Sequence, residues 1–215
     1  VLDELFFAFF EADRIDDGFT LNGLEAGLDL QRDRIMAICR ESKAREVRQA
    51  ANAKERLLLW KSRKQAFGAI GRLSPNFLTQ DGVVPRSKLP DIMRFICATS
   101  AKYGLRIPNV FHAGDGNIHP LVLYDERDPD QVRRAVAAGN EILTKCIEFG
   151  GSVTGEHGIG VEKIDFMPRL FSPEDLAMML RLREAFNPKG MCSPQKVLPT
   201  AGACIEQSKA GRRGA

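Results

Sequence analysis

The sequence predicts an α+β fold: a small antiparallel sheet packed against helices, followed by a C-terminal helical segment. Two observations support this class. Long segments with apolar residues at helical spacing alternate with short apolar runs, and clusters of proline and glycine separate them. The 215 residues with 44% hydrophobic content can also fill a core of this size.

Helical periodicity and end signals locate the predicted helices. The expected helices cover residues 24–47, 50–70, 91–103, 129–149 and 173–186. Gly68 and Gly71 should end the second helix, and Gly104 should end the third. Pro129 follows Asp128, and Ser172 precedes Pro173, as at the first turn of a helix.

The remaining segments predict loops and strands. Residues 74–90 contain three prolines around Val83 and Val84, so we expect a loop with one short strand. Residues 107–112 and 118–124 are apolar runs on either side of a turn-forming segment, and they predict a β-hairpin. If residues 114–117 form its loop, His112 lies opposite His119, with Cβ atoms about 5 Å apart.

Composition excludes several classes of protein. The net charge of +3 is too small for a dedicated nucleic-acid binder. No apolar run approaches the roughly 20 residues of a membrane-spanning helix. Five dispersed cysteines show neither a disulfide framework nor a metal-cluster motif, which favours a reducing, cytoplasmic location.

All three histidines lie in or beside glycine-dense segments, and this placement predicts a metal site. Two facing imidazoles, His112 and His119, could share a divalent ion, and Glu156 could complete the ligand set. Neighbouring residues of an extended chain point in opposite directions, so we expect His157 to face the substrate instead. Asp115 is either a further ligand or, more simply, a turn residue. Each motif alone would be read as an ordinary turn.

Several blocks of sequence resemble one family. They are residues 111–120 (FHAGDGNIHP), 150–160 (GGSVTGEHGIG), 59–68 (LWKSRKQAFG), 80–86 (QDGVVPR) and 187–190 (NPKG). Together they resemble the C-terminal part of FAD-linked oxidases acting on 2-hydroxy acids, the family of the glycolate oxidase FAD-linked subunit and of D-lactate dehydrogenases. The resemblance covers residues 21–199. It implies a substrate domain with a ferredoxin-like cap. Residues 1–20 depart from the family pattern and form an atypical segment, and the Ala-, Gly- and basic-rich composition of residues 200–215 predicts a flexible tail.

The resemblance also implies roles for individual residues. His112, His119 and Glu156 match the family's ligands for a divalent metal, which could be Zn, Mn or Fe. His157 matches the histidine that takes the proton of the substrate hydroxyl, and Arg63 matches an arginine on the substrate carboxylate. The alternative is that Arg63 has no ligand and is a solvated charge on a helix surface. Ser193 and Lys196 match cofactor-binding positions, although Ser193-Pro194-Gln195-Lys196 replaces the usual Asn-Pro-Gly-Lys.

The implied function is oxidation of glycolate or D-lactate to the 2-oxo acid with FAD as hydride acceptor. The family's flavin is held mainly by an N-terminal domain that is not visible here, and the chain starts at Val1 rather than Met. We therefore expect a truncated, colourless chain that works with a FAD domain in cis or with partner subunits. Candidate partners include a separate iron–sulfur subunit, which could bring the chain to the periphery of the inner membrane. The alternative is a folded metal-binding fragment without activity.

Overall fold

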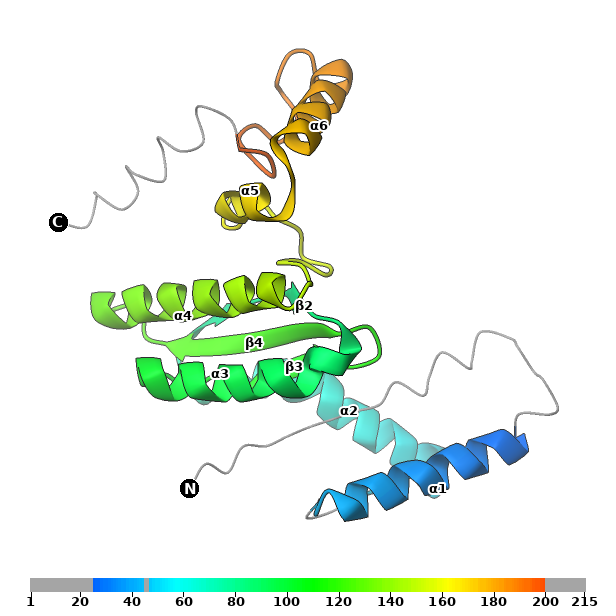
Figure 1. Ribbon diagram of the computed structural model, residues 1–215. Coiled ribbons are helices and arrows are strands. Elements are labelled where there is room, and N and C mark those ends of the chain that lie inside the picture. The colour runs from blue at the N-terminus through cyan, green and yellow to red at the C-terminus, as the bar shows by residue number, and fades with distance from the viewer. Residues whose placement is uncertain (1–24, 45–46, 200–215) are drawn as a thin grey trace. The chain divides into compact units, whose positions relative to one another are not determined.

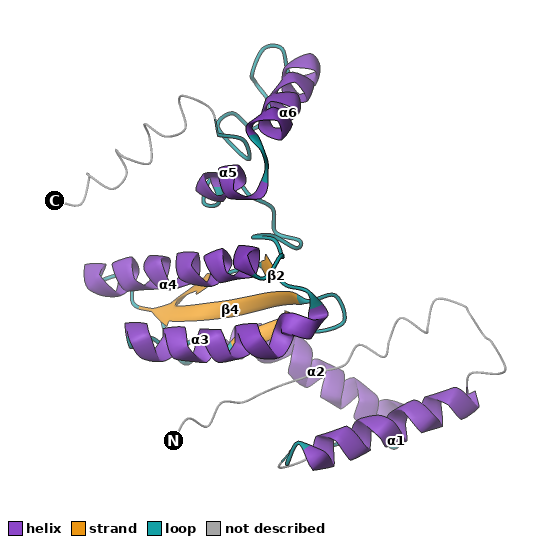
Figure 2. Ribbon diagram, viewed as in Figure 1, coloured by secondary structure: helices purple, strands orange, loops and turns teal. Residues whose placement is uncertain are grey.

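The computed structural model describes residues 25–44 and 47–199. The predicted atypical segment 1–20 and the predicted tail 200–215 lie outside these residues. Within the described part, residues 25–72 and residues 73–199 belong to two compact units, which are treated separately below. The helices and strands are labelled in Figure 1 and coloured by type in Figure 2.

The first unit contains two helices, α1 (Glu25–Glu41) and α2 (Ala53–Ile70). Both were predicted, and α1 ends several residues before the expected boundary. Asn52 caps α2 by accepting a hydrogen bond from the Glu55 backbone N–H at 3.0 Å. The expectation that Gly68 helps to end α2 is wrong, because the helix continues through Gly68 and its C-cap is Gly71.

The second unit is built on an antiparallel sheet of four strands, β1 (Asn76–Thr79), β2 (Gly82–Val83), β3 (Asn109–His112) and β4 (Asn117–Tyr124). Strand β4 pairs with each of the other three strands. Strands β1 and β2 pair with β4 in one continuous register, interrupted at Gln80 and Asp81. The predicted single short strand in 74–90 is therefore two strands, and the interruption between them becomes part of the candidate site.

The hairpin of β3 and β4 forms as predicted, but its register differs. His112 pairs with Asn117, and His119 pairs with Val110, so the two histidines are not directly opposite. The loop is residues 113–116 because Gly116, with φ of 81°, takes the left-handed position next to the strand. Asp115 stabilises this turn by accepting a hydrogen bond from the Asn117 N–H at 3.1 Å.

Two long helices, α3 (Leu89–Tyr103) and α4 (Pro129–Glu148), pack against each other and against the sheet, as Figure 1 shows. The core between them holds Ile92 and Ile96 of α3, Ala138 and Ile142 of α4, and Ile118 and Val122 of β4. The even-numbered residues of β4 therefore face the helices. Because side chains alternate along a strand, the odd-numbered residues, including His119, face the other side of the sheet.

The end signals read from the sequence for α3 and α4 are present. Gly104 closes α3 with φ of 61°, and Asp128 caps α4 by accepting hydrogen bonds from the N–H groups of Asp130 and Gln131. Pro90 lies in the first turn of α3 rather than in the preceding loop. These interactions set where α3 ends and where α3 and α4 begin.

The C-terminal segment is helical, as predicted, and contains α5 (Met167–Leu170) and α6 (Pro173–Phe186). Ser172 and Asp175 form a reciprocal capping box at the start of α6. The short helix α5 was not predicted. The α+β class is thus confirmed. No helix among the described residues combines the length and apolar character that spanning a membrane requires.

Candidate metal centre

The position of His119 depends on the proline that follows it. Gln80 donates its N–H to the Pro120 carbonyl at 3.0 Å, but Pro120 has no N–H to return to the Gln80 carbonyl. The Gln80 carbonyl instead lies 3.3 Å from His119 Nδ1. A carbonyl only accepts, so Nδ1 carries the proton and the lone pair of His119 is on Nε2.

His119 is almost fully buried, and its surroundings favour the neutral ring. Burial lowers the pKa of His119 below its ordinary value, although the Gln80 carbonyl and the Asp81 carboxylate oppose this shift. A neutral imidazole with a defined tautomer is the form that binds a metal ion.

His112 reaches the same place from β3 despite the changed register. Directly paired residues share a face of the sheet, and so do residues two positions apart. His112 therefore lies diagonally across from His119 on one face, and their ring centroids are 5.5 Å apart in an edge-to-face arrangement. The predicted proximity of the two imidazoles holds, although the predicted direct pairing does not.

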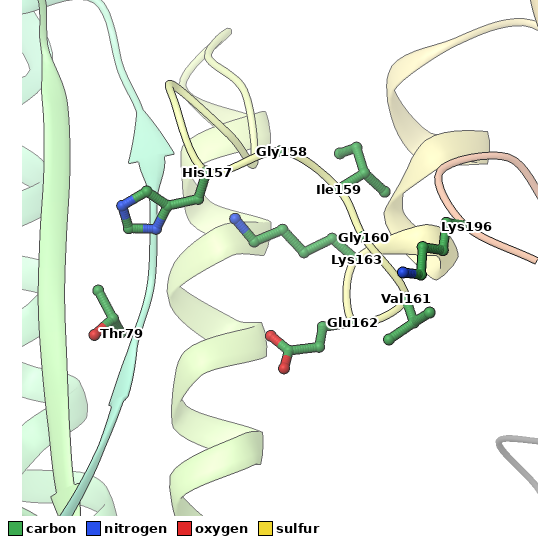
Figure 3. Close-up of a pocket in the computed structure, with 9 residues that line it drawn as sticks. All are labelled: Thr79, His157, Gly158, Ile159, Gly160, Val161, Glu162, Lys163 and Lys196. Atoms are coloured by element: carbon green, nitrogen blue, oxygen red, sulfur yellow. The ribbon is translucent and has the colours of Figure 1, made fainter. Parts of the chain in front are cut away.

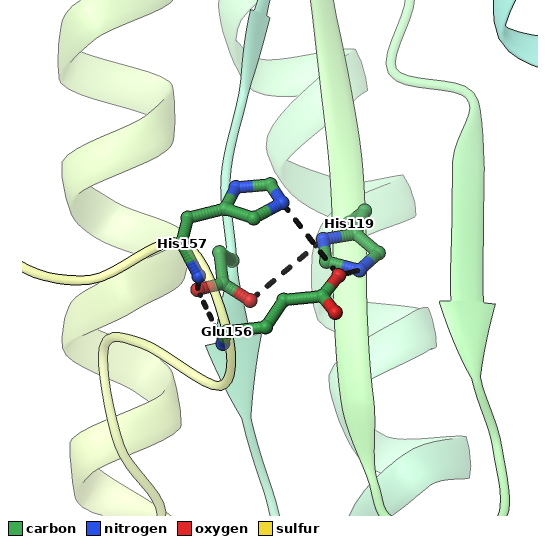
Figure 4. Close-up of side chains that lie close together, drawn as sticks. His119, Glu156 and His157 are labelled. Atoms are coloured by element: carbon green, nitrogen blue, oxygen red, sulfur yellow. Dashed lines mark hydrogen bonds and ion pairs between the residues drawn. The ribbon is translucent and has the colours of Figure 1, made fainter.

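The loop after α4 brings Glu156 and His157 to this pair (Figure 4). Glu156 Oε1 lies 3.0 Å from His119 Nε2 and 3.8 Å from His112 Nε2. The His157 ring stacks on the His119 ring with centroids 4.9 Å apart. Glu156 and His157 do not diverge as an extended chain would require, because Glu156 Oε1 is only 3.7 Å from His157 Nε2.

Asp81, which the sequence analysis missed, explains this loop geometry. Its carboxylate accepts hydrogen bonds from the Thr154 hydroxyl and from the N–H groups of Gly155, Glu156 and His157. The backbone curls around the carboxylate, so neighbouring side chains no longer alternate in direction. Burial by itself raises the pKa of Asp81, but these hydrogen bonds outweigh it and bring the pKa to about 2.

Gly155 is required where the loop meets the sheet. A Cβ atom at this position would lie 2.1 Å from Asn117 Nδ2 and 2.7 Å from Asn117 Cγ. Only glycine allows this approach without displacing Asn117 or the loop. The prediction that glycine permits close backbone approach beside Glu156 is therefore confirmed at Gly155.

The donor set fits a divalent metal ion. Donors bound to one ion at roughly 2.0–2.2 Å lie about 3–3.5 Å from each other, close to the 3.0 and 3.8 Å between Glu156 Oε1 and the two imidazoles. The His119 Nε2 lone pair also faces the Glu156 carboxylate, and two acceptors 3.0 Å apart repel each other unless a cation lies against both. Asp81, His119, Glu156 and His157 offer atoms that all lie within 4.8 Å of one another, a group that includes two of the predicted ligands but not His112. The predicted ligand set of His112, His119 and Glu156 therefore stays a prediction.

A pocket of about 290 Å³ adjoins His157 (Figure 3). It is lined by Thr79, His157, Gly158, Ile159, Gly160, Val161, Glu162, Lys163 and Lys196. The Lys163 side chain is 8% exposed, and its Nζ lies 3.9 Å from Asp81 Oδ2, which is too long for a hydrogen bond. Burial lowers the pKa of Lys163, while the Asp81 charge opposes this shift.

The other predicted site residues lie elsewhere. Lys196 lines the pocket beside His157, and Ser193 is an exposed residue of the same C-terminal segment. Arg63 lies in α2, in the other compact unit, and its side chain is not among those described. The roles of Arg63, Ser193 and Lys196 remain predictions.

The fold and the site together define a class: an α+β domain that presents imidazole and carboxylate donors beside a pocket. Residues 21–197 match the family model described as FAD linked oxidases, C-terminal domain. The chain therefore belongs to the family of FAD-linked oxidases, as the sequence motifs predicted.

Curated relatives agree with this assignment. The chain is 42% identical over 186 residues to the glycolate oxidase subunit GlcD of Escherichia coli (strain K12), covering 86% of the chain and 37% of that protein. It is 36% identical over 165 residues to GlcD of Bacillus subtilis (strain 168), covering 77% and 35%. The mitochondrial D-lactate dehydrogenase (cytochrome) of Kluyveromyces lactis is 31% identical over 154 residues, covering 69% and 26%. The chain thus spans little more than a third of the first two relatives.

Proposed function

We propose that this chain is the substrate- and metal-binding part of a FAD-dependent oxidoreductase that converts glycolate or D-lactate to the corresponding 2-oxo acid. The observation that carries the proposal is the position of Glu156 Oε1, 3.0 Å from His119 Nε2 and 3.8 Å from His112 Nε2. The similarity to GlcD and D-lactate dehydrogenase supports the substrate class.

In this proposal, His112, His119 and Glu156 hold the metal. When bound, a divalent metal would supply Lewis acidity at the substrate hydroxyl and FAD would supply a hydride acceptor. Zn, Mn and Fe all suit a set of two imidazoles and one carboxylate.

His157 takes the hydroxyl proton in this proposal. Its side chain is 45% exposed and lines the pocket, so a substrate can reach it. Proton removal at His157 Nε2 would accompany loss of the hydride from the carbon bearing the hydroxyl. Arg63 would bind the substrate carboxylate through a bidentate pair, which Lys cannot reproduce.

A chimera tests the activity. The matching segment of E. coli GlcD would be replaced by this chain, and oxidation of glycolate and D-lactate would be measured with an artificial electron acceptor. We expect activity with at least one of the two acids and, for His157→Ala, a loss of about 100-fold or more in kcat. A chimera that binds metal and FAD but oxidises neither acid would favour the alternative, a metal-binding fragment without activity.

Metal binding by the isolated chain tests the ligand set. Calorimetric titration with Zn²⁺ and Mn²⁺ should give a lower affinity for Glu156→Gln by about 100-fold or more, because the charged ligand is lost while its shape is retained. Glu162→Gln is the matched control, since Glu162 is an exposed carboxylate that lines the pocket but does not belong to the ligand cluster. Equal affinities for Glu156→Gln and the unmodified chain would contradict the proposed ligand set.

A further inference from the structure

Residue Ser152 pairs with Val83 of β2 through two backbone hydrogen bonds, and residues 154–157 are bonded to the interruption between β1 and β2 through one oxygen atom. Asp81 Oδ2 accepts hydrogen bonds from Thr154 Oγ1 at 2.7 Å, Gly155 N at 2.9 Å, Glu156 N at 3.0 Å and His157 N at 2.8 Å. Three successive backbone N–H groups that converge on one anion form an anion-binding nest. Here the anion is supplied by the protein itself.

The Asp81 carboxylate suits this task because it is buried and ionised. Its side chain has no exposed surface, so water does not compete for the converging donors. Its pKa of about 2 keeps it charged at neutral pH, and Lys163 Nζ, 3.9 Å away, provides a nearby positive charge. Hydrogen bonds to a charged acceptor are about twice as strong as those between neutral groups.

Asp81 is better placed to orient the site than to bind the metal. Oδ2 is occupied by its four donors, and Oδ1 lies 3.8 Å from His119 Nδ1, the ring nitrogen that carries the proton. The metal-binding lone pair of His119 is on the opposite ring nitrogen, which faces Glu156. The lone pair of His119 is therefore directed away from Asp81.

The side chains that the loop presents depend on this anchor. Glu156 and His157 are 53% and 45% exposed, so packing contributes little to their position. We propose that Asp81 is the positioning residue of the site, whose buried carboxylate holds residues 154–157 so that Glu156 and His157 face His119. The value of this position for catalysis rests on the proposed function, but the anchoring itself does not.

Amide hydrogen exchange and nuclear Overhauser effects on the metal-free chain test the anchoring directly. In the unmodified chain, the amide protons of residues 155–157 should be protected, and the rings of His119 and His157 should show a mutual Overhauser effect. In Asp81→Ala, we expect protection of these three amides to fall by at least about 10-fold and the ring contact to be lost. Asp81→Asn, which retains the shape without the charge, should give an intermediate loss.

Asp128→Ala is the matched control. Asp128 also accepts hydrogen bonds from backbone N–H groups in the same unit, but at the start of α4. This variant should leave residues 155–157 protected. Unchanged protection and an unchanged ring contact in Asp81→Ala would overturn the proposal. If Asp81→Ala does not fold, the same measurements on Asp81→Asn test the proposal. Full protection of residues 155–157 in that variant would also overturn it.

Metal titration then separates positioning from general stability. Asp81→Ala should weaken Zn²⁺ binding by about 10- to 100-fold. If Asp81 acts through Glu156, Asp81→Ala should reduce Zn²⁺ affinity much less in the Glu156→Gln background than in the unmodified chain. Fully additive losses would contradict a role through Glu156. If the unmodified chain binds no metal while residues 155–157 lose protection in Asp81→Ala, the proposed ligand set fails and the anchoring stands.

Discussion

The two halves of the candidate metal centre are positioned by different means. The strand half, His112 and His119, belongs to paired strands, and the His119 side chain is only 3% exposed. The loop half, Glu156 and His157, is about half exposed and is held through the Asp81 carboxylate. The strand half is thus formed when the sheet forms, whereas the backbone of the loop half is held by hydrogen bonds to one buried charge. Substitutions should therefore separate stability from metal binding.

The largest effect is expected for His119→Ala, which should reduce both the stability of the fold and the affinity for metal. Removing a buried side chain and leaving the Gln80 carbonyl unpaired should lower the free energy of unfolding by about 2–4 kcal/mol. Metal affinity should fall by about 100-fold or more, because a ligand is lost. Chemical denaturation and calorimetric titration measure the two effects.

Leu121→Ala is the control for this prediction, because Leu121 is fully buried on the same face of β4 but offers no ligand. It should lose stability and retain metal affinity at temperatures where it is folded. Loss of stability without loss of metal affinity in His119→Ala would remove His119 from the ligand set.

A smaller effect, confined to metal binding, is expected for Gly155→Ala. The added Cβ would lie 2.1 Å from Asn117 Nδ2, so the Asn117 side chain or the loop must move. Metal affinity should fall about 10-fold, as for other residues that support ligands without binding the metal. Gly114→Ala is the control, since no atom lies within 4 Å of a Cβ there. Equal affinities in both variants would show that the loop tolerates displacement.

The smallest effect is expected for Pro120→Ala, which tests the strand half through its hydrogen bonds. Alanine restores an N–H opposite the Gln80 carbonyl, where it would compete with His119 Nδ1. We expect a few-fold loss of metal affinity and a change in stability of no more than about 1 kcal/mol. Pro129→Ala, at the start of α4, should leave affinity unchanged. An affinity equal to that of the unmodified chain would mean that His119 keeps its orientation without this carbonyl.

The sequence predicted those features whose causes are local. Asp128, Ser172 and Gly104 mark helix ends, and each makes the capping interaction expected from its neighbours in the chain. The hairpin register was wrong by one position in the loop, because both Asn117 and Gly116 are suitable turn residues. His112 and His119 still lie close together, because the strand period of two residues keeps both side chains on one face of the sheet.

The anchor of the loop half could not be found in the same way. Asp81 and Thr154 are 73 residues apart, and only the folded sheet brings them together. For the strand half one signal was available, because Pro120 in a run that reads as an inner strand leaves the carbonyl opposite it, that of Gln80, without its usual donor. The role of Arg63 stays a prediction, since it lies in the other compact unit.

The interruption between β1 and β2 gives the two halves a common origin. Gln80, which orients His119, and Asp81, which anchors the loop, are joined by a single peptide bond. A thermal displacement of this dipeptide would therefore shift the His119 imidazole and the loop that carries Glu156 in the same direction. The separation between donor atoms would then vary less than the absolute position of either one, so the cluster could keep its dimensions while the surrounding sheet fluctuates.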